Sequence, residues 1–204
     1  MALQDLEKLE ARMRRLEDIL EIEKLQSRYQ HYLSLGKADK VRELFAQKNR
    51  VSLEAGDSGV IEAEGSEEIR KKLFLGTGDK LKTVGRYSEN HAVNPVIEVS
   101  KDGKTAKGVW FSPGIGTFAS MNLQGWEWGK YDMDYVKEDG KWKIRHLRWY
   151  QTFETPFEKG WLYQQEFGSM RTRGIPPDKE TTRHMPYSPY RINYMLPEPP
   201  EPDE

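Results

Sequence analysis

The sequence contains no cysteine among its 204 residues. This absence excludes disulfide-stapled folds, thiol nucleophiles and cysteine-ligated metal sites. Net charge is also nearly absent, because 32 basic and 33 acidic side chains leave a formal charge of −1. Such a balance gives no general attraction to nucleic acid or to an anionic membrane surface, so neither is expected as a partner.

Long apolar runs are missing as well. No stretch approaches the roughly 20 apolar residues that a membrane-spanning helix needs. The N-terminal MALQDLEKLEARMRR has no apolar signal core, so we expect a cytoplasmic protein. Hydrophobic residues make up only 36% of the chain, yet 6 Trp, 10 Tyr and 7 Phe supply large side chains for one core.

The N-terminal residues 2–20 carry an apolar stripe with heptad spacing. Its members step by three and four residues: Leu6, Leu9, Met13, Leu16 and Leu20. The pattern predicts an amphipathic helix, but two heptads are too few for a stable isolated coiled coil. The helix is therefore expected to lie either on its own domain or on a neighbouring subunit.

The order of the remaining elements indicates an α+β fold. Helices are predicted over residues 21–35, 40–45 and 67–75, with a first strand at 51–54. Long strands follow at about 93–99, 106–119, 121–137 and 142–153, which as a meander form an antiparallel sheet.

The chain changes character after Pro156. A helix is predicted over 158–167, and eight of the 11 prolines follow Gly174, which excludes regular structure there. We therefore divide the chain into an N-terminal helix (1–20), a domain (21–156) and a C-terminal helix with an extended proline-rich arm (157–204). The arm is expected to dock on the domain or on a neighbour.

A hairpin over residues 131–153 has the clearest pattern. Tyr131, Met133 and Tyr135 alternate with Asp132 and Asp134, as in a strand with one buried face. The tyrosine face is expected to point inward unless a bulge reverses the phase. A tight turn at 138–140 connects this strand to its partner, in which His146, Arg148 and Tyr150 share one face and Leu147, Trp149 and Gln151 share the other.

With these elements placed, the chain resembles the SnoaL-like branch of the nuclear transport factor 2-like (NTF2-like) superfamily. The matching segments are EIEKLQSRYQHYLSLGKADKVRELFA, GSEEIRKKL, HAVNPVIEVSKDGKTAKGVW and DYVKEDGKWKI, which span about residues 21–153. The pattern is most similar to scytalone dehydratase-like and bile-acid dehydratase-like members. The resemblance implies a cone, in which a curved antiparallel sheet wraps round N-terminal helices and leaves a pocket at its open end.

The resemblance also implies catalytic residues. His91 begins the HAVNPVIEV strand, where it matches a histidine of the dehydratase-like members, and a neutral imidazole can take or deliver a proton. Tyr29 matches a tyrosine that can stabilise an oxyanion. The chain departs from the pattern at Ser34, where members often carry Asp, and at Tyr131, where the scytalone-type Asn is expected. Tyr131 is the third catalytic candidate, since its hydroxyl can help Tyr29 to polarise a substrate oxygen.

Further residues are predicted to line the pocket. The substrate-binding candidates are Tyr32, Ser34, Trp110, Met133, Tyr135, His146, Arg148 and Gln151. Arg148 can bind a substrate carboxylate or phenolate through its planar fork of donors, or form an interstrand ion pair. The four His residues show no metal-ligand spacing, so neither a metal nor another cofactor is expected.

Two functions fit these expectations. The first is a cofactor-independent lyase, dehydratase-like, or an isomerase acting on a small hydrophobic molecule that is aromatic or polycyclic. The second is a non-catalytic binding or assembly subunit resembling the small subunit of ring-hydroxylating dioxygenases. In both cases we expect a homo-oligomer, with a trimer favoured over a dimer.

Overall fold

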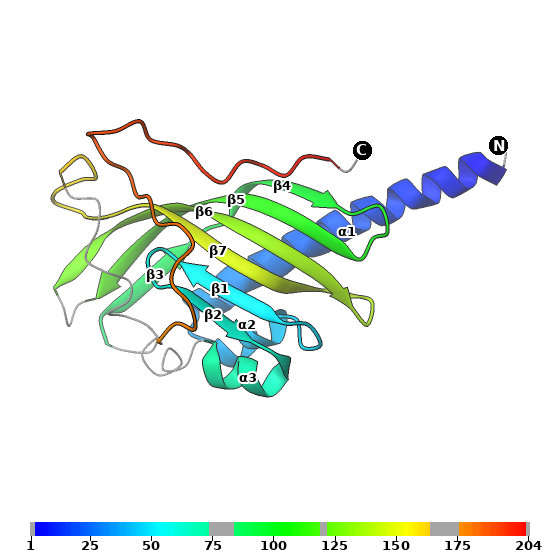
Figure 1. The fold of residues 1–204 in the computed structure, drawn as a ribbon, viewed down its shortest axis with the longest axis horizontal. Coiled ribbons are helices and arrows are strands. Elements are labelled where there is room, and N and C mark those ends of the chain that lie inside the picture. The colour runs from blue at the N-terminus through cyan, green and yellow to red at the C-terminus, as the bar shows by residue number, and fades with distance from the viewer. Residues whose placement is uncertain (1–2, 74–83, 119–121, 164–175, 203–204) are drawn as a thin grey trace.

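The computed structural model describes residues 3–73, 84–118, 122–163 and 176–202. In this part of the chain, helices pack against one face of a curved seven-stranded sheet (Figure 1). The prediction of an α+β fold, with a curved sheet packed on N-terminal helices, is confirmed. We call the sheet face that packs on the helices the inner face, and the opposite one the outer face.

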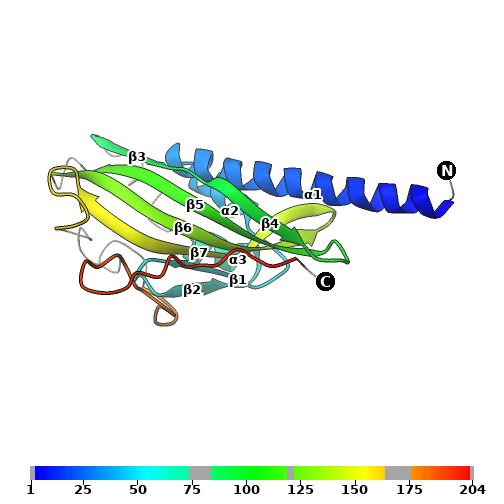
Figure 2. The same cartoon turned by 90° about the horizontal axis from the view of Figure 1, so that it is seen from above.

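One long helix opens the fold. α1 spans Leu3–Ser34, so the helices expected over 2–20 and 21–35 are continuous across the predicted domain boundary. The physical reason is that neither Gly nor Pro interrupts the sequence between them. The second half of α1 buries Ile22, Leu25 and Tyr29 against the sheet. The first half projects beyond it (Figures 1 and 2), and the heptad residues 6, 9, 13, 16 and 20 are 45–61% exposed.

Two short helices and seven strands complete the domain. The helices are α2 (Ala38–Leu44) and α3 (Gly65–Lys72). The strands are β1 (Val51–Ala55), β2 (Val60–Ala63), β3 (Arg86–Asn90), β4 (Val93–Val99), β5 (Thr105–Phe118), β6 (Leu123–Glu138) and β7 (Lys141–Pro156). Their order is β2-β1-β7-β6-β5-β3, and β4 also pairs with β5. The sheet is mixed, because β1 runs parallel to β7 while the other pairs are antiparallel.

The direction of the side chains on β6 follows the predicted alternation. Tyr131, Met133 and Tyr135 are at most 4% exposed on the inner face, whereas Asp132 and Asp134 lie half-buried on the outer face. On β7 the register shifts twice against β6, near Ile144 and again between Gln151 and Phe153. Each shift changes which residues of β7 face inward.

Buried hydrogen bonds fix α1 to the sheet. The Trp110 indole nitrogen donates to the Tyr135 hydroxyl at 3.1 Å, and that hydroxyl donates to Gln26 Oε1 at 3.0 Å. Nearer the hairpin turn, Asp18 Oδ1 accepts from the Trp142 indole at 2.8 Å and from Lys137 Nζ at 2.5 Å. The helix therefore forms a fixed wall for the interior of the cone.

The C-terminal segment lies on the outer side of its own domain. The residues that the structure describes from 176 onward form an extended arm beside β2, β1 and β7 (Figure 1). Of the helix expected over 158–167, residues 158–163 form turns, and the remainder lies outside the described residues. Within the described ranges, no helix is both long and apolar enough to cross a membrane.

Candidate functional site inside the cone

The interior between α1 and the sheet holds a group of polar side chains. Tyr29 and Gln30 come from α1, Ser112 from β5, Tyr131 from β6 and Gln151 from β7, and all are at most 8% exposed. The rings of Tyr29 and Tyr131 meet edge to face, with centroids 6.2 Å apart and planes at 84°. Alternation along each strand brings these residues from distant parts of the chain to one place.

The two tyrosines are hydrogen-bond donors at neutral pH. Burial raises the pKa of Tyr131, although the nearby polar groups of Gln30 and Ser112 act in the opposite direction. Burial also raises the pKa of Tyr29, and Tyr131 adds to this effect. Both hydroxyls therefore stay protonated, which suits the stabilisation of negative charge on an oxygen atom and not the removal of a proton.

Several buried polar atoms of this interior have few partners. Among the described residues, no hydrogen bond reaches Asn90 Oδ1 or the Trp149 indole nitrogen, and the Gln30 amide and the Ser112 hydroxyl have no partner of normal geometry beyond their interaction with Tyr131. A buried polar group left unpaired costs about 1–3 kcal/mol. Such a concentration at one place indicates a site that a polar ligand or water completes.

Two carboxylates face each other on the inner face near this group. Glu127 of β6 and Glu154 of β7 are register partners, and Glu154 is 1% exposed. Arg86 of β3 lies near Glu127: burial lowers the pKa of Arg86, while Glu127 acts to raise it. Sequence reasoning missed both carboxylates. Strand alternation from Tyr131 through Gly129 would have placed Glu127 on the inner face. The direction of Glu154 could not be predicted in this way, because the second register shift changes the alternation along β7.

The structure places His91 on the outer side, away from the tyrosines. Gly114 and its neighbours on the inner face of β5 are buried, and Asn90 pairs with Gly114. Asn90 therefore points inward, and the next residue, His91, points outward. The His91 side chain is 60% exposed, and its Nε2 lies 3.9 Å from Glu89 Oε2. A Cβ at position 114 would lie 2.2 Å from Asn90 Oδ1, so Gly114 is what makes room for the asparagine.

Most of the predicted pocket residues are also placed elsewhere. Ser34 is exposed at the last residue of α1, and Tyr32 is a half-buried neighbour of the core. Trp110, Met133 and Tyr135 are enclosed in the hydrophobic core, to which the rings of Tyr29 and Tyr131 also belong. Of the candidates, only Tyr29, Tyr131 and Gln151 come together in the polar group.

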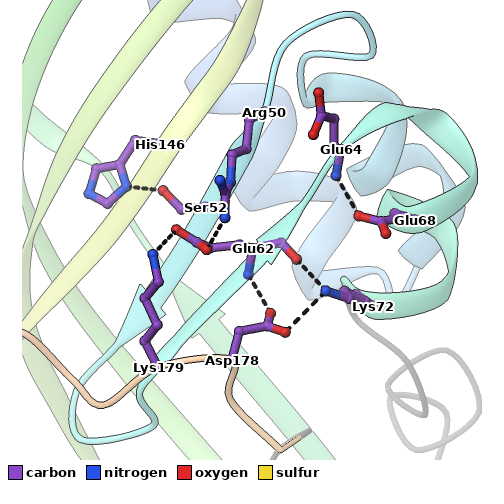
Figure 3. A network of polar contacts seen from close by, with 9 residues as sticks. All are labelled: Arg50, Ser52, Glu62, Glu64, Glu68, Lys72, His146, Asp178 and Lys179. Carbon is purple, nitrogen blue, oxygen red and sulfur yellow. Dashed lines mark hydrogen bonds and ion pairs between the residues drawn. The ribbon is translucent and has the colours of Figure 1, made fainter.

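His146 and Arg148 lie on the outer face. His146 Nδ1 is 2.6 Å from the Ser52 hydroxyl (Figure 3). The Arg148 guanidinium lies over the Tyr150 ring at 4.0 Å, and its Nε is 3.6 Å from Glu54 Oε2. The position of Arg148 thus fits the predicted alternative of an interstrand ion pair, and the partner strand is β1.

A metal site is not evident in the part of the chain that the structure describes. No three His, Asp or Glu side chains there gather closely enough to hold an ion.

Comparison with known proteins matches this architecture. The model of a family described as a SnoaL-like domain covers residues 14–148. A putative scytalone dehydratase from Novosphingobium aromaticivorans is 20% identical, with 76% of this chain and 97% of that chain covered and a TM-score of 0.56. A hexachlorocyclohexane dehydrochlorinase, LinA-type3 from Novosphingobium barchaimii, is 18% identical, with 71% and 93% covered and a TM-score of 0.58.

A third similar structure is an NTF2-like protein with a cystatin-like fold from Novosphingobium aromaticivorans. It is 21% identical, 72% of this chain and 90% of that chain are covered, and the TM-score is 0.56. At these identities the likeness shows the fold alone. No curated protein matches the sequence.

Proposed function

Since this chain belongs to the SnoaL-like domain family, we propose that it is a cofactor-independent lyase or isomerase. Its substrate is a small hydrophobic molecule, aromatic or polycyclic, that carries an oxygen substituent and binds inside the cone. The observation that carries the proposal is the group of buried polar side chains around Tyr131, several of whose atoms have no hydrogen bond of normal geometry within the described ranges. The similar structures named as a putative dehydratase and a dehydrochlorinase support elimination as the type of reaction.

The residues suit removal of water from a β-hydroxy ketone. Tyr131, with Tyr29 beside it, donates to the carbonyl oxygen and stabilises the enolate. Glu154 takes the proton next to the carbonyl, and the electron pair moves to the oxygen. When the enolate collapses, the β-hydroxyl leaves as water after taking the proton back from Glu154. Without a leaving group, return of the proton to another carbon gives isomerisation.

His91 has no part in this scheme, because its exposed imidazole lies on the other side of the sheet. Sequence reasoning made it the acid–base residue from a family pattern. The buried carboxylate of Glu154 replaces it here as the base.

The test uses a bicyclic β-hydroxy ketone, whose loss of water yields a fluorescent naphthol. Tyr131→Phe removes one oxyanion donor and should lower kcat about 100-fold, and Glu154→Gln should abolish turnover. Tyr87→Phe is the matched control, since Tyr87 is exposed on the outer face and donates to Glu89 at 2.6 Å. His91→Ala should leave turnover unchanged. Loss of turnover in His91→Ala together with normal turnover in Tyr131→Phe would contradict the proposal.

A non-catalytic binding subunit is the second candidate. One observation favours it: the rings of Tyr29 and Tyr131 are packed within the hydrophobic core. Titration of the wild-type protein with a naphthol, followed by tryptophan fluorescence, separates the two. Tight binding that Tyr131→Phe weakens, without turnover of the hydroxy ketone, would support the binding role.

We further propose that the protein is a homo-oligomer, a trimer in preference to a dimer. The exposed heptad residues on the projecting half of α1 support association, because they leave a continuous apolar stripe in water. Light scattering on the purified chain measures the state, and a monomer at micromolar concentration would contradict it.

A further inference from the structure

The C-terminal arm is held on the domain by charged contacts at its start. Asp178 Oδ2 accepts from the Glu62 backbone N–H at 2.8 Å, and Asp178 Oδ1 lies 3.1 Å from Lys72 Nζ (Figure 3). Lys179 Nζ donates to Glu62 Oε1 at 2.8 Å. These contacts join the arm to β2 and α3.

A buried carboxylate forms the second anchor. Glu54 of β1 is 2% exposed, and its Oε1 accepts from the Thr181 hydroxyl at 2.6 Å and from the Thr182 backbone N–H at 2.7 Å. Arg148 shares this carboxylate and donates to the Arg183 carbonyl oxygen at 2.8 Å. The arm is therefore part of the folded domain at this point.

The third anchor lies further along the arm. Lys130 Nζ donates to the carbonyl oxygens of Met195, at 2.8 Å, and Pro197, at 3.2 Å. The Tyr187 backbone N–H donates to the Thr152 carbonyl at 2.6 Å. Residues 183–196 consequently cross the outer face of β6 and β7 between two fixed points.

A cavity of about 40 Å³ lies between this stretch of the arm and the sheet. Its lining includes three cationic side chains, Lys130, Arg183 and Arg191, together with Tyr150, Tyr187 and Asn193. No Asp or Glu lines it. By the same measure one water needs about 10–15 Å³, so the cavity has room for a group of a few non-hydrogen atoms.

The three cations contact only neutral groups among the described residues. Besides its two carbonyl partners, Lys130 Nζ lies 4.8 Å from the centre of the Phe111 ring. Arg183 Nε lies 3.2 Å from Met185 Sδ, and Arg191 donates to the Pro186 carbonyl. This contrasts with Lys179 and Arg148, each of which has a carboxylate partner. Burial lowers the pKa of Lys130, as expected for a cation without a counter-charge.

We propose that the cavity under the arm binds one small anionic group, a carboxylate or a phosphate, through Arg183, Arg191 and Lys130. Three like charges at one cavity repel one another, and an anion converts that repulsion into attraction. Both guanidinium groups offer forked donors that fit either anion. The asparagine and tyrosines of the lining supply neutral polar contacts. This site lies under the arm on the outer face, and the lining residue that it shares with the polar group around Tyr131 is Gln151.

Calorimetric titration of the full chain tests the proposal, with benzoate, phenyl phosphate and inorganic phosphate as probes at constant ionic strength. We expect saturable binding of at least one probe, weakened about 10-fold or more by Arg183→Gln and by Arg191→Gln. Preference for benzoate identifies a carboxylate ligand, and preference for the two phosphates identifies a phosphate ligand. Lys141→Gln is the matched control, because Lys141 is an exposed cation at the distant 138–141 turn.

Three results would overturn the proposal. One is the absence of saturable binding up to about 10 mM of every probe. Another is equal weakening by Lys141→Gln, which would reduce the effect to overall charge. The last is loss of binding in Tyr131→Phe, which would place the probe inside the cone. Unchanged binding in Tyr131→Phe supports an independent outer site, whatever happens to turnover.

Discussion

On the inner face of β6 and β7, Tyr131 and Met133 are almost completely buried, whereas His146 and Arg148 on the outer face make polar contacts with β1 and the arm. The same two strands thus carry two different kinds of chemistry. The inner face combines hydroxyl, amide and carboxylate groups in a buried interior. The outer face resembles a polar surface that the arm covers in part. The role of a residue on these strands is therefore predicted less well by its chemical type than by the face of the sheet on which it lies.

The largest effect should come from truncating a core side chain of β6. Met133→Ala removes a fully buried side chain and should lower the free energy of unfolding by about 2–5 kcal/mol. The neighbouring Asp134→Ala, on the outer face, should change it by less than about 0.5 kcal/mol. Urea unfolding measures both. Equal effects would remove the distinction between the faces.

Glu54 is the outer-face residue that should behave like an inner one. Glu54→Ala leaves Arg148 without its carboxylate and the arm without its second anchor, and should lower the free energy of unfolding by about 3 kcal/mol. Limited trypsin digestion should then cut rapidly after Arg183. Wild-type resistance to cleavage in this variant would mean that the arm is held by other contacts.

A smaller effect is expected from the buried hydrogen-bond chain that joins α1 to the sheet. Tyr135→Phe leaves the Trp110 indole and the Gln26 carbonyl oxygen without their shared partner, at a cost of about 1–3 kcal/mol. Thermal unfolding of this variant is compared with that of Tyr87→Phe, which removes an exposed hydroxyl. If both changes are neutral, the chain does not contribute to stability.

The smallest effect concerns Asp132 on the outer face. Burial and the neighbouring Asp134 raise the pKa of Asp132, against the opposing influence of His146, Lys107 and Arg148. Its charged form is therefore unfavourable in the folded state. The penalty is absent when both states are protonated, grows as pH rises from the ordinary value of 3.8 to the raised folded value, and is complete above it.

Asp132→Asn should consequently raise the melting temperature slightly at pH 7. The gain should disappear when the same comparison is made below the ordinary carboxyl pKa. Calorimetric melts of both proteins across this range measure the difference. A variant that is less stable at pH 7 would show that its charge pairs outweigh burial.

Sequence patterns predicted the long hairpin and its inward tyrosine face because the alternation from Tyr131 to Tyr135 is unbroken. They did not predict β3, whose RYSEN segment has no apolar alternation. The direction of His91 depends on that strand, through the pairing of Asn90 with Gly114. The local sequence therefore identified His91 as a candidate, but it could not show on which face of the sheet the histidine lies.

The remaining features depend on contacts that are distant in sequence. The inward direction of Glu154 follows from a register shift that arises only when β6 and β7 pair. The contacts of the arm with Glu54 join residues that are separated in the sequence by 127 positions in one case and 128 in the other. The proline content predicted an extended arm, but it could not show where the arm docks.

A crystal structure of the protein soaked with a naphthol would show whether a ligand binds inside the cone beside Tyr131. We expect the ring between α1 and the inner face, with the naphthol oxygen within hydrogen-bonding distance of the Tyr131 hydroxyl. A naphthol bound on the outer face beside His91, with the polar group around Tyr131 closed, would contradict it.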